Sequence, residues 1–83
     1  MSNHSSEIVN EWTGTAQKLL VGRKIVNVRY LNEQEVEHMG WYSSTVVIEL
    51  DNGLLIWPSR DDEGNDAGAL FTTDPEVMTL PVI

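Results

Sequence analysis

The stretch TVVIELDNGLLIWP, residues 45–58, decides the fold of this chain. Two runs rich in β-branched and aliphatic residues flank Asn52 and Gly53, a pair that supplies the two positive φ angles of a type I′ turn. The stretch therefore predicts a β-hairpin with a two-residue loop, in which Leu50 faces Leu55 and Ile48 faces Trp57.

This register divides the hairpin into two apolar faces. The first face contains the best core candidates, which are Val46, Ile48, Leu50, Leu55 and Trp57. The second face, with Val47, Leu54 and Ile56, is too apolar to be left wholly in water. We expect the N-terminal helix or another subunit to cover part of it.

Working outward from the hairpin, the sequence predicts further elements on both sides. Residues 24–31 alternate like a strand, and Asn32 with Glu35 forms a capping-box pattern before a short helix over 33–39. Apolar residues at helical spacing predict an amphipathic helix over 5–21, although Thr13, Gly14 and Thr15 leave two shorter pieces as an alternative. Residues 69–73 and 77–83 predict a short strand and a final edge strand.

Together these elements predict one α+β domain over residues 1–83. Its N-terminal helix packs on a strongly twisted antiparallel sheet of four or five strands that curls toward a barrel, with a short second helix. Residues 1–4 are expected to be flexible, and the sheet domain over 24–83 includes an acidic loop at 59–68.

Composition excludes several classes of function. The 83 residues include 13 Asp and Glu against 5 Lys and Arg, for a net charge of −8, so we expect binding neither to nucleic acid nor to an anionic membrane. The chain has no cysteine and begins without a signal-like apolar run, which predicts a cytoplasmic protein without thiolate chemistry. A domain this small gains stability from self-association, so we expect a homo-oligomer.

The acidic loop SRDDEGNDAG is one candidate site. Its carboxylates could bind Ca²⁺ or Mg²⁺, but their spacing fits the EF-hand pattern poorly, so capping of backbone N–H groups is favoured and no metal or cofactor is predicted. Arg60 could bind an anion, yet an ion pair with its acidic neighbours is favoured. The carboxylates considered are Asp61, Asp62, Glu63 and Asp66.

Trp41 and Tyr42, between the short helix and the hairpin, form the second candidate site. Their rings could line a groove for a cationic or aromatic ligand beside the acidic loop, although core packing is the favoured reading. A hydrolase would need Ser43, Ser44 or Ser59 with His38. The chain has no G-x-S-x-G motif, so no catalytic residue is predicted.

The segments GRKIVNVRYL, GWYSS, LDNG, PSRDDEGND and GALF resemble a group of small bacterial and phage-associated proteins with no assigned activity. The resemblance covers about three quarters of the chain, and PSRDDEGN with GALF is its most specific part. Some small proteins of this kind travel on mobile gene cassettes. The resemblance transfers no catalytic residue.

Three classes of function remain. The sequence favours a non-enzymatic binding or protein-interaction module that self-associates and takes a protein or small-molecule partner. One alternative is an acidic regulator or charge mimic that binds a basic partner. The other is a metal-dependent enzyme or metal-binding protein that uses the acidic loop.

Overall fold

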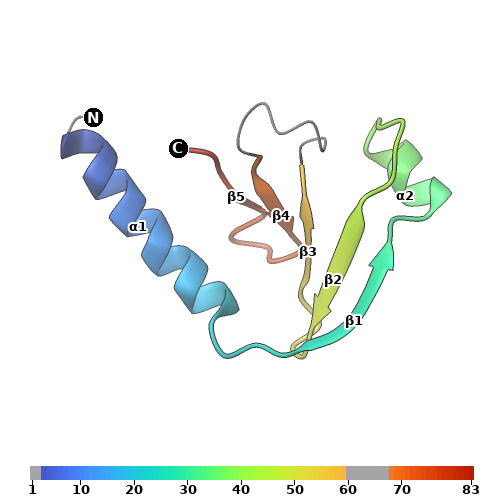
Figure 1. The fold of residues 1–83 in the computed structure, drawn as a ribbon, viewed down its shortest axis with the longest axis horizontal. Coiled ribbons are helices and arrows are strands. Elements are labelled where there is room, and N and C mark those ends of the chain that lie inside the picture. The colour runs from blue at the N-terminus through green and yellow to red at the C-terminus, as the bar shows by residue number, and fades with distance from the viewer. Residues whose placement is uncertain (1–2, 60–67) are drawn as a thin grey trace.

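The computed structural model describes residues 3–59 and 68–83, and over these ranges the chain is an open α+β fold (Figure 1). The elements in chain order are α1 (Asn3–Leu20), β1 (Ile25–Tyr30), α2 (Glu33–His38), β2 (Val46–Leu50), β3 (Leu55–Pro58), β4 (Leu70–Thr72) and β5 (Thr79–Leu80). The five described strands form one antiparallel sheet in the order β1-β2-β3-β4-β5. This confirms the predicted α+β class, but the sheet does not close into a barrel. No described helix is long and apolar enough to cross a membrane.

The hairpin forms where it is predicted, but its register differs by one residue. Ile48 pairs with Ile56 and Glu49 pairs with Leu55, and the Leu50 N–H donates to the Leu54 carbonyl at 2.9 Å. The loop therefore contains three residues, 51–53. Among these three residues, only Gly53 has a positive φ angle, of 86°. This is typical of a three-residue hairpin loop that ends in a glycine in the left-handed conformation.

The shifted register changes which residues share a face. We call the face that carries Ile48, Leu50, Leu54 and Ile56 the core face, because Leu50, Leu54 and Ile56 form a buried cluster there. The other face, which we call the α2 face, carries Val47, Leu55 and Trp57. The predicted grouping of Leu55 and Trp57 with Ile48 and Leu50 is thus wrong, because a slip of one residue turns every side chain of one strand to the other face.

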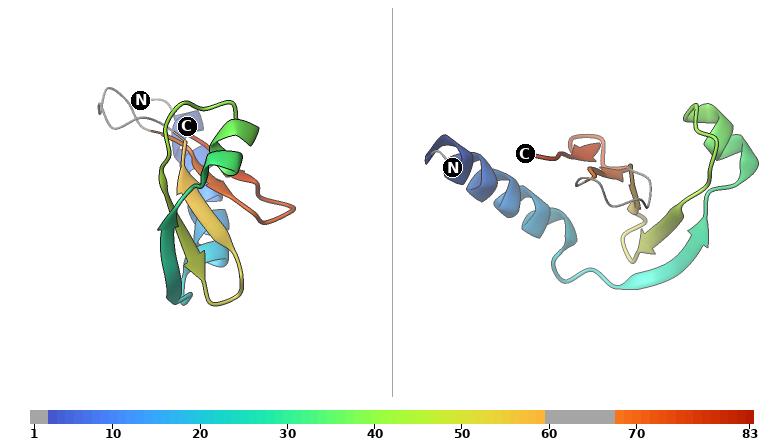
Figure 2. Two further views of the ribbon diagram at one scale, coloured as in Figure 1. Left: turned by 90° about the vertical axis from the view of Figure 1, so that its right-hand side faces the viewer. Right: turned by 45° about the horizontal axis from the view of Figure 1, so that its top comes forward.

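The N-terminal helix is continuous and starts at Asn3, slightly earlier than predicted. Thr13 and Thr15 do not break it, and their hydroxyls donate to the carbonyls of Val9 and Glu11 one turn earlier, at 2.7 and 3.2 Å. Only the last turn of α1, at Leu19 and Leu20, packs against the core cluster. The rest of the helix extends obliquely to one side of the sheet (Figures 1 and 2).

The short helix α2 begins with the predicted capping box. The Asn32 side chain accepts the Glu35 backbone N–H at 2.9 Å, and the Glu35 carboxylate accepts the Asn32 N–H at 2.9 Å. Two backbone donors at the helix start are thereby satisfied. This cap fixes α2 directly after β1, where it covers one end of the α2 face.

Candidate functional site

The two predicted sites differ in what the structure describes of them. The acidic-loop residues fall outside the described ranges; these are Arg60, Asp61, Asp62, Glu63 and Asp66. Trp41 and Tyr42 lie in the segment that joins α2 to β2. Among the described residues, no group of three or more His, Asp or Glu side chains is placed to hold a metal ion.

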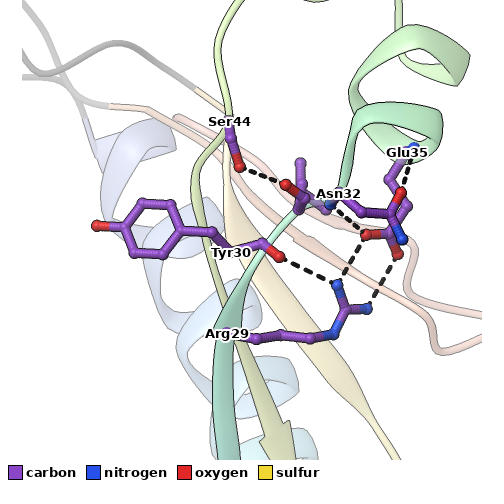
Figure 3. Close-up of polar contacts among 6 residues, drawn as sticks. Arg29, Tyr30, Asn32, Glu35 and Ser44 are labelled. Carbon is purple, nitrogen blue, oxygen red and sulfur yellow. Dashed lines mark hydrogen bonds and ion pairs between the residues drawn. The ribbon is translucent and has the colours of Figure 1, made fainter.

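The segment that carries Trp41 and Tyr42 is held by backbone hydrogen bonds at both ends. The Trp41 N–H donates to the Val36 carbonyl at 3.0 Å, after Gly40 has turned the chain with a φ of 73°. At the other end, the Ser44 hydroxyl donates to the Leu31 carbonyl at 2.7 Å (Figure 3). The Leu31 N–H in turn donates to the Thr45 carbonyl at 3.0 Å. The segment therefore returns to the end of β1 in a defined conformation.

Trp41 and Tyr42 have different roles in this segment. Trp41 is half-buried and stacks on Phe71 with a centroid separation of 6.2 Å, and Phe71 in turn contacts Trp57 at 6.0 Å. This agrees with the favoured packing role of Trp41. Tyr42, in contrast, is fully exposed. Of the two aromatic rings, that of Trp41 is therefore packed against Phe71, and that of Tyr42 is exposed to solvent.

Tyr42 stands between two surface hollows. One has a volume of about 560 Å³ and continues to Pro58 and to Ser59, the first residue of the acidic loop. The other, of about 370 Å³, lies against α2 at Val36 and Glu37. Trp41 and Tyr42 line both hollows, so the structure supports an aromatic groove at this position, although Trp41 offers only part of its ring.

An ion pair that sequence reasoning missed connects β1 to α2 (Figure 3). The two terminal nitrogens of Arg29 donate to the Glu35 carboxylate at 2.7 and 2.9 Å, and the guanidinium also donates to the Tyr30 carbonyl at 3.2 Å. These bonds from Arg29, followed by the Asn32 N–H, lower the pKa of Glu35 to about 2. The same hydrogen bond raises the pKa of Arg29. The capping box marks Glu35 in the sequence, but its second partner depends on how β1 meets α2.

A third hollow, of about 300 Å³, lies between α2 and the α2 face of the sheet. It is lined by Met39, Val47, Leu55 and Trp57 together with polar groups that include His38. The indole Nε1 of Trp57 is buried and has no hydrogen-bond partner. His38 thus lines this third hollow. Ser43 and Ser59 line the hollow of about 560 Å³, and the Ser44 hydroxyl is hydrogen-bonded to the Leu31 carbonyl. The described residues do not bring a serine and His38 together as a hydrolase would require.

A group of exposed apolar side chains lies on β1. Val28 and Tyr30 pair with Ile48 and Val46, so they extend the core face, yet they are 54 % and 66 % exposed. Ile25 and Val26, beside a bulge at the start of the strand, are also exposed. We call Ile25, Val26, Val28 and Tyr30 the β1 apolar surface. The sequence predicted the strand and its alternation but placed no exposed surface there.

Comparison with known proteins adds no assignment. No protein-family model matches this sequence, and neither a curated protein nor a solved structure matches it. The resemblance to small bacterial and phage-associated proteins therefore stays a prediction. The case for a function depends on the geometry of the molecule itself.

Proposed function

We propose that this protein is a small non-enzymatic interaction module that works as a homo-oligomer. Its contact surface is the exposed part of the core face, the β1 apolar surface beside the core cluster. The single observation that carries the proposal is the exposure of apolar β1 side chains on the face of the sheet that elsewhere forms the core.

The total surface of the chain supports this proposal. Its accessible area is 6388 Å², whereas a compact monomer of this mass exposes about 5,000 Å². The excess of about 1,400 Å² exceeds the roughly 800 Å² that each partner buries in a standard protein–protein interface. The radius of gyration, 14.1 Å, is likewise larger than the about 12 Å expected for a compact domain of this length. A single copy thus has enough surplus surface for a stable interface.

The small size of the core points in the same direction. Within the described ranges, the buried apolar residues are Leu31, Val47, Leu50, Leu54 and Ile56. Domains of this length gain only a few kcal/mol from a single core, about 3–5 at most. Burial of further apolar surface against a second copy would add directly to this stability.

The charge distribution permits two copies to meet despite a net charge of −8 on each. The strand positions that form the core face in β1 and β2 are uncharged, whereas Arg29 and Glu49 belong to the α2 face. Arg29 is already paired with Glu35. Association through the core face therefore brings no carboxylate of these two strands into an apolar interface, where its desolvation would be costly.

Light scattering coupled to size exclusion, over a series of protein concentrations, tests the proposal. We expect a mass of at least twice 9.3 kDa for the wild-type protein. Val28→Lys places a charge in the proposed interface and should give the monomer mass. A wild-type protein that stays at 9.3 kDa throughout the series would overturn the proposal.

Asn27→Lys is the matched control for this experiment. Asn27 is also exposed and is the neighbour of Val28 in β1, but it pairs with Glu49 on the α2 face. Both variants have the same net charge. A difference in mass between them therefore depends on which face of β1 carries the lysine, and not on the net charge of the chain. We expect Asn27→Lys to keep the mass of the wild-type oligomer.

A further inference from the structure

We propose that α1 is an exchanged arm: in a dimer, the first three turns of α1 from one copy lie on the β1 apolar surface of the other, and reciprocally. This inference rests on the proposed self-association and names the segment that mediates it. The last turn of α1 stays on its own sheet, where Leu19 and Leu20 contact the core cluster. The arm needs no rearrangement, since it already extends away from its own strands (Figure 1).

The arm has an apolar side suited to this role. Ile8, Trp12, Ala16 and Leu19 recur at spacings of four, four and three, which places them on one stripe of the helix. Val9 borders this stripe and is 43 % exposed. The charged side chains Glu7, Glu11 and Lys18 are also four and seven residues apart, and the 100° step per residue gathers them on a separate narrow strip, about 115° around the helix from the centre of the apolar stripe. One side of the arm can therefore enter an apolar interface without a charge.

The connection between α1 and β1 fixes the direction in which the arm leaves. Gly22 has a φ of 82°, which only glycine adopts readily, and it ends the helix. The next residues are tied to the hairpin loop: the Lys24 carbonyl accepts the Asp51 N–H at 2.8 Å, and Arg23 forms an ion pair with Asp51 at 3.5 Å. This anchored turn directs α1 away from the sheet and leaves the β1 apolar surface of the same chain uncovered.

A dimer joined edge to edge through two β1 strands is the main alternative arrangement. The register shift between Ile25 and Asn27 opposes it, because a bulge breaks the regular ladder that edge pairing requires. Edge pairing would also leave Val9 and the half-buried side chains of Ile8 and Trp12 without a partner. Exchange of α1 buries both the stripe and the β1 apolar surface, so it accounts for more of the surplus area.

Cross-linking between single-cysteine variants tests the exchange, since the natural chain has no cysteine. Val9→Cys and an affinity-tagged Val28→Cys are unfolded together, refolded as a mixture and treated with a short bismaleimide. A link between residues 9 and 28 in this mixture joins two different chains, because each chain carries only one cysteine. We expect this link to be the dominant cross-linked product, ahead of links between two Val9→Cys chains or two Val28→Cys chains.

Two neighbouring positions serve as controls. Asn10→Cys lies next to Val9 but 100° around the helix, away from the stripe, and Asn27→Cys lies on the opposite face of β1 from Val28. Pairs that include either control should give at least several-fold less product. Equal yields from all pairs, or dominant links between two Val28→Cys chains, would overturn the exchange.

Light scattering separates the failure of this inference from the failure of the proposed function. If cross-linking contradicts the exchange but the mass is that of a dimer, self-association stands and only the role of α1 fails. A monomer mass would remove both proposals.

Discussion

The loop between β2 and β3 requires a left-handed backbone conformation at Gly53. Its φ of 86° lies in the left-handed region, and a side chain there is strained even though the space around it is open. Gly53→Ala should therefore lower the free energy of unfolding by about 1–2 kcal/mol. Denaturant unfolding of the purified variant measures this loss.

Gly14→Ala is the matched control for Gly53→Ala. Gly14 lies inside α1 with no neighbouring atom close to the position of a Cβ. The same substitution should there raise the free energy of unfolding by roughly 0.5–1 kcal/mol, because alanine favours the helix. Equal effects at both positions would show that Gly53 does not adopt the left-handed conformation.

Glu35 gives the protein a pH dependence whose sign follows from its pKa. Because Arg29 and the Asn32 N–H lower this pKa from 4.5 to about 2, the folded state binds the proton more weakly than the unfolded state. The stabilisation from the ionised carboxylate is fully present above about pH 4.5 and is lost as the pH falls toward 2. Thermal unfolding across this range measures the loss.

Glu35→Gln isolates the contribution of the charge, since glutamine at this position can still take part in a capping box. We expect the variant to be less stable than wild type near neutral pH. The gap between the two proteins should narrow steadily in acid. A gap that stays constant down to pH values near 2 would contradict the assigned ion pair.

At the scale of elements, local patterns in the sequence were sufficient to predict most of the fold. The capping box at Asn32 and Glu35, the strand β1 and the hairpin between β2 and β3 are confirmed, but the alternation in β1 is interrupted by a bulge between Ile25 and Asn27 and does not give a buried face. The hairpin register was wrong because the pair Asn52-Gly53 is compatible with loops of two or three residues. The choice depends on whether Asp51 belongs to the strand or to the loop, and Asp51 is tied to the linker at Lys24, a contact that periodicity does not reveal.

The candidate site was predicted less completely, for a related physical reason. The aromatic segment at Trp41 and Tyr42 was found because the residue types are distinctive, but the Arg29–Glu35 pair was not. That pair forms only because β1 and α2 meet at a particular angle. Contacts between elements depend on the arrangement of the chain in three dimensions, which local spacing does not specify.

The turn from β4 to β5 depends on one buried hydroxyl. Thr72 is 4 % exposed, donates to the Val77 carbonyl and accepts the Asp74 N–H at 3.0 Å. Thr72→Val keeps the shape of the side chain but leaves both backbone groups without this partner. We expect a loss of about 1–3 kcal/mol in the free energy of unfolding, measured by urea denaturation.

Thr72→Ser separates the hydroxyl from the methyl group in this experiment. Serine keeps the hydrogen bonds and removes only a small apolar group, so the serine variant should be more stable than the valine variant. The reverse order would mean that packing, and not hydrogen bonding, holds this turn.

For the whole molecule, the unpaired face of the sheet predicts that stability depends on protein concentration. Because association stabilises the folded state by mass action, the Tm of the wild-type protein should rise as its concentration increases. Val28→Lys should have a Tm that does not change with concentration, and Asn27→Lys should behave like wild type. Differential scanning calorimetry over a dilution series makes this comparison, and a wild-type Tm independent of concentration would contradict an oligomer that forms within that series.

The position of α1 could not be predicted at this scale. Its apolar periodicity correctly indicated an amphipathic helix, which has to bury one side against a partner. Periodicity does not show whether that partner belongs to the same chain. The direction of α1 is instead determined by Gly22 and by the anchoring of Arg23 and Lys24 to the hairpin loop.

The simple strand order has a consequence for the time course of folding. Since the order of the strands in the sheet equals their order in the chain, each strand pairs with its neighbour in sequence, and no distant segments have to find each other. Meanders of this kind close by short-range steps and need no slow long-range search. The sheet of each chain is therefore expected to form in a rapid first-order phase. In the dimer proposed above, the encounter of two chains would follow as a separate second-order phase, whose rate increases with the number of chains per unit volume.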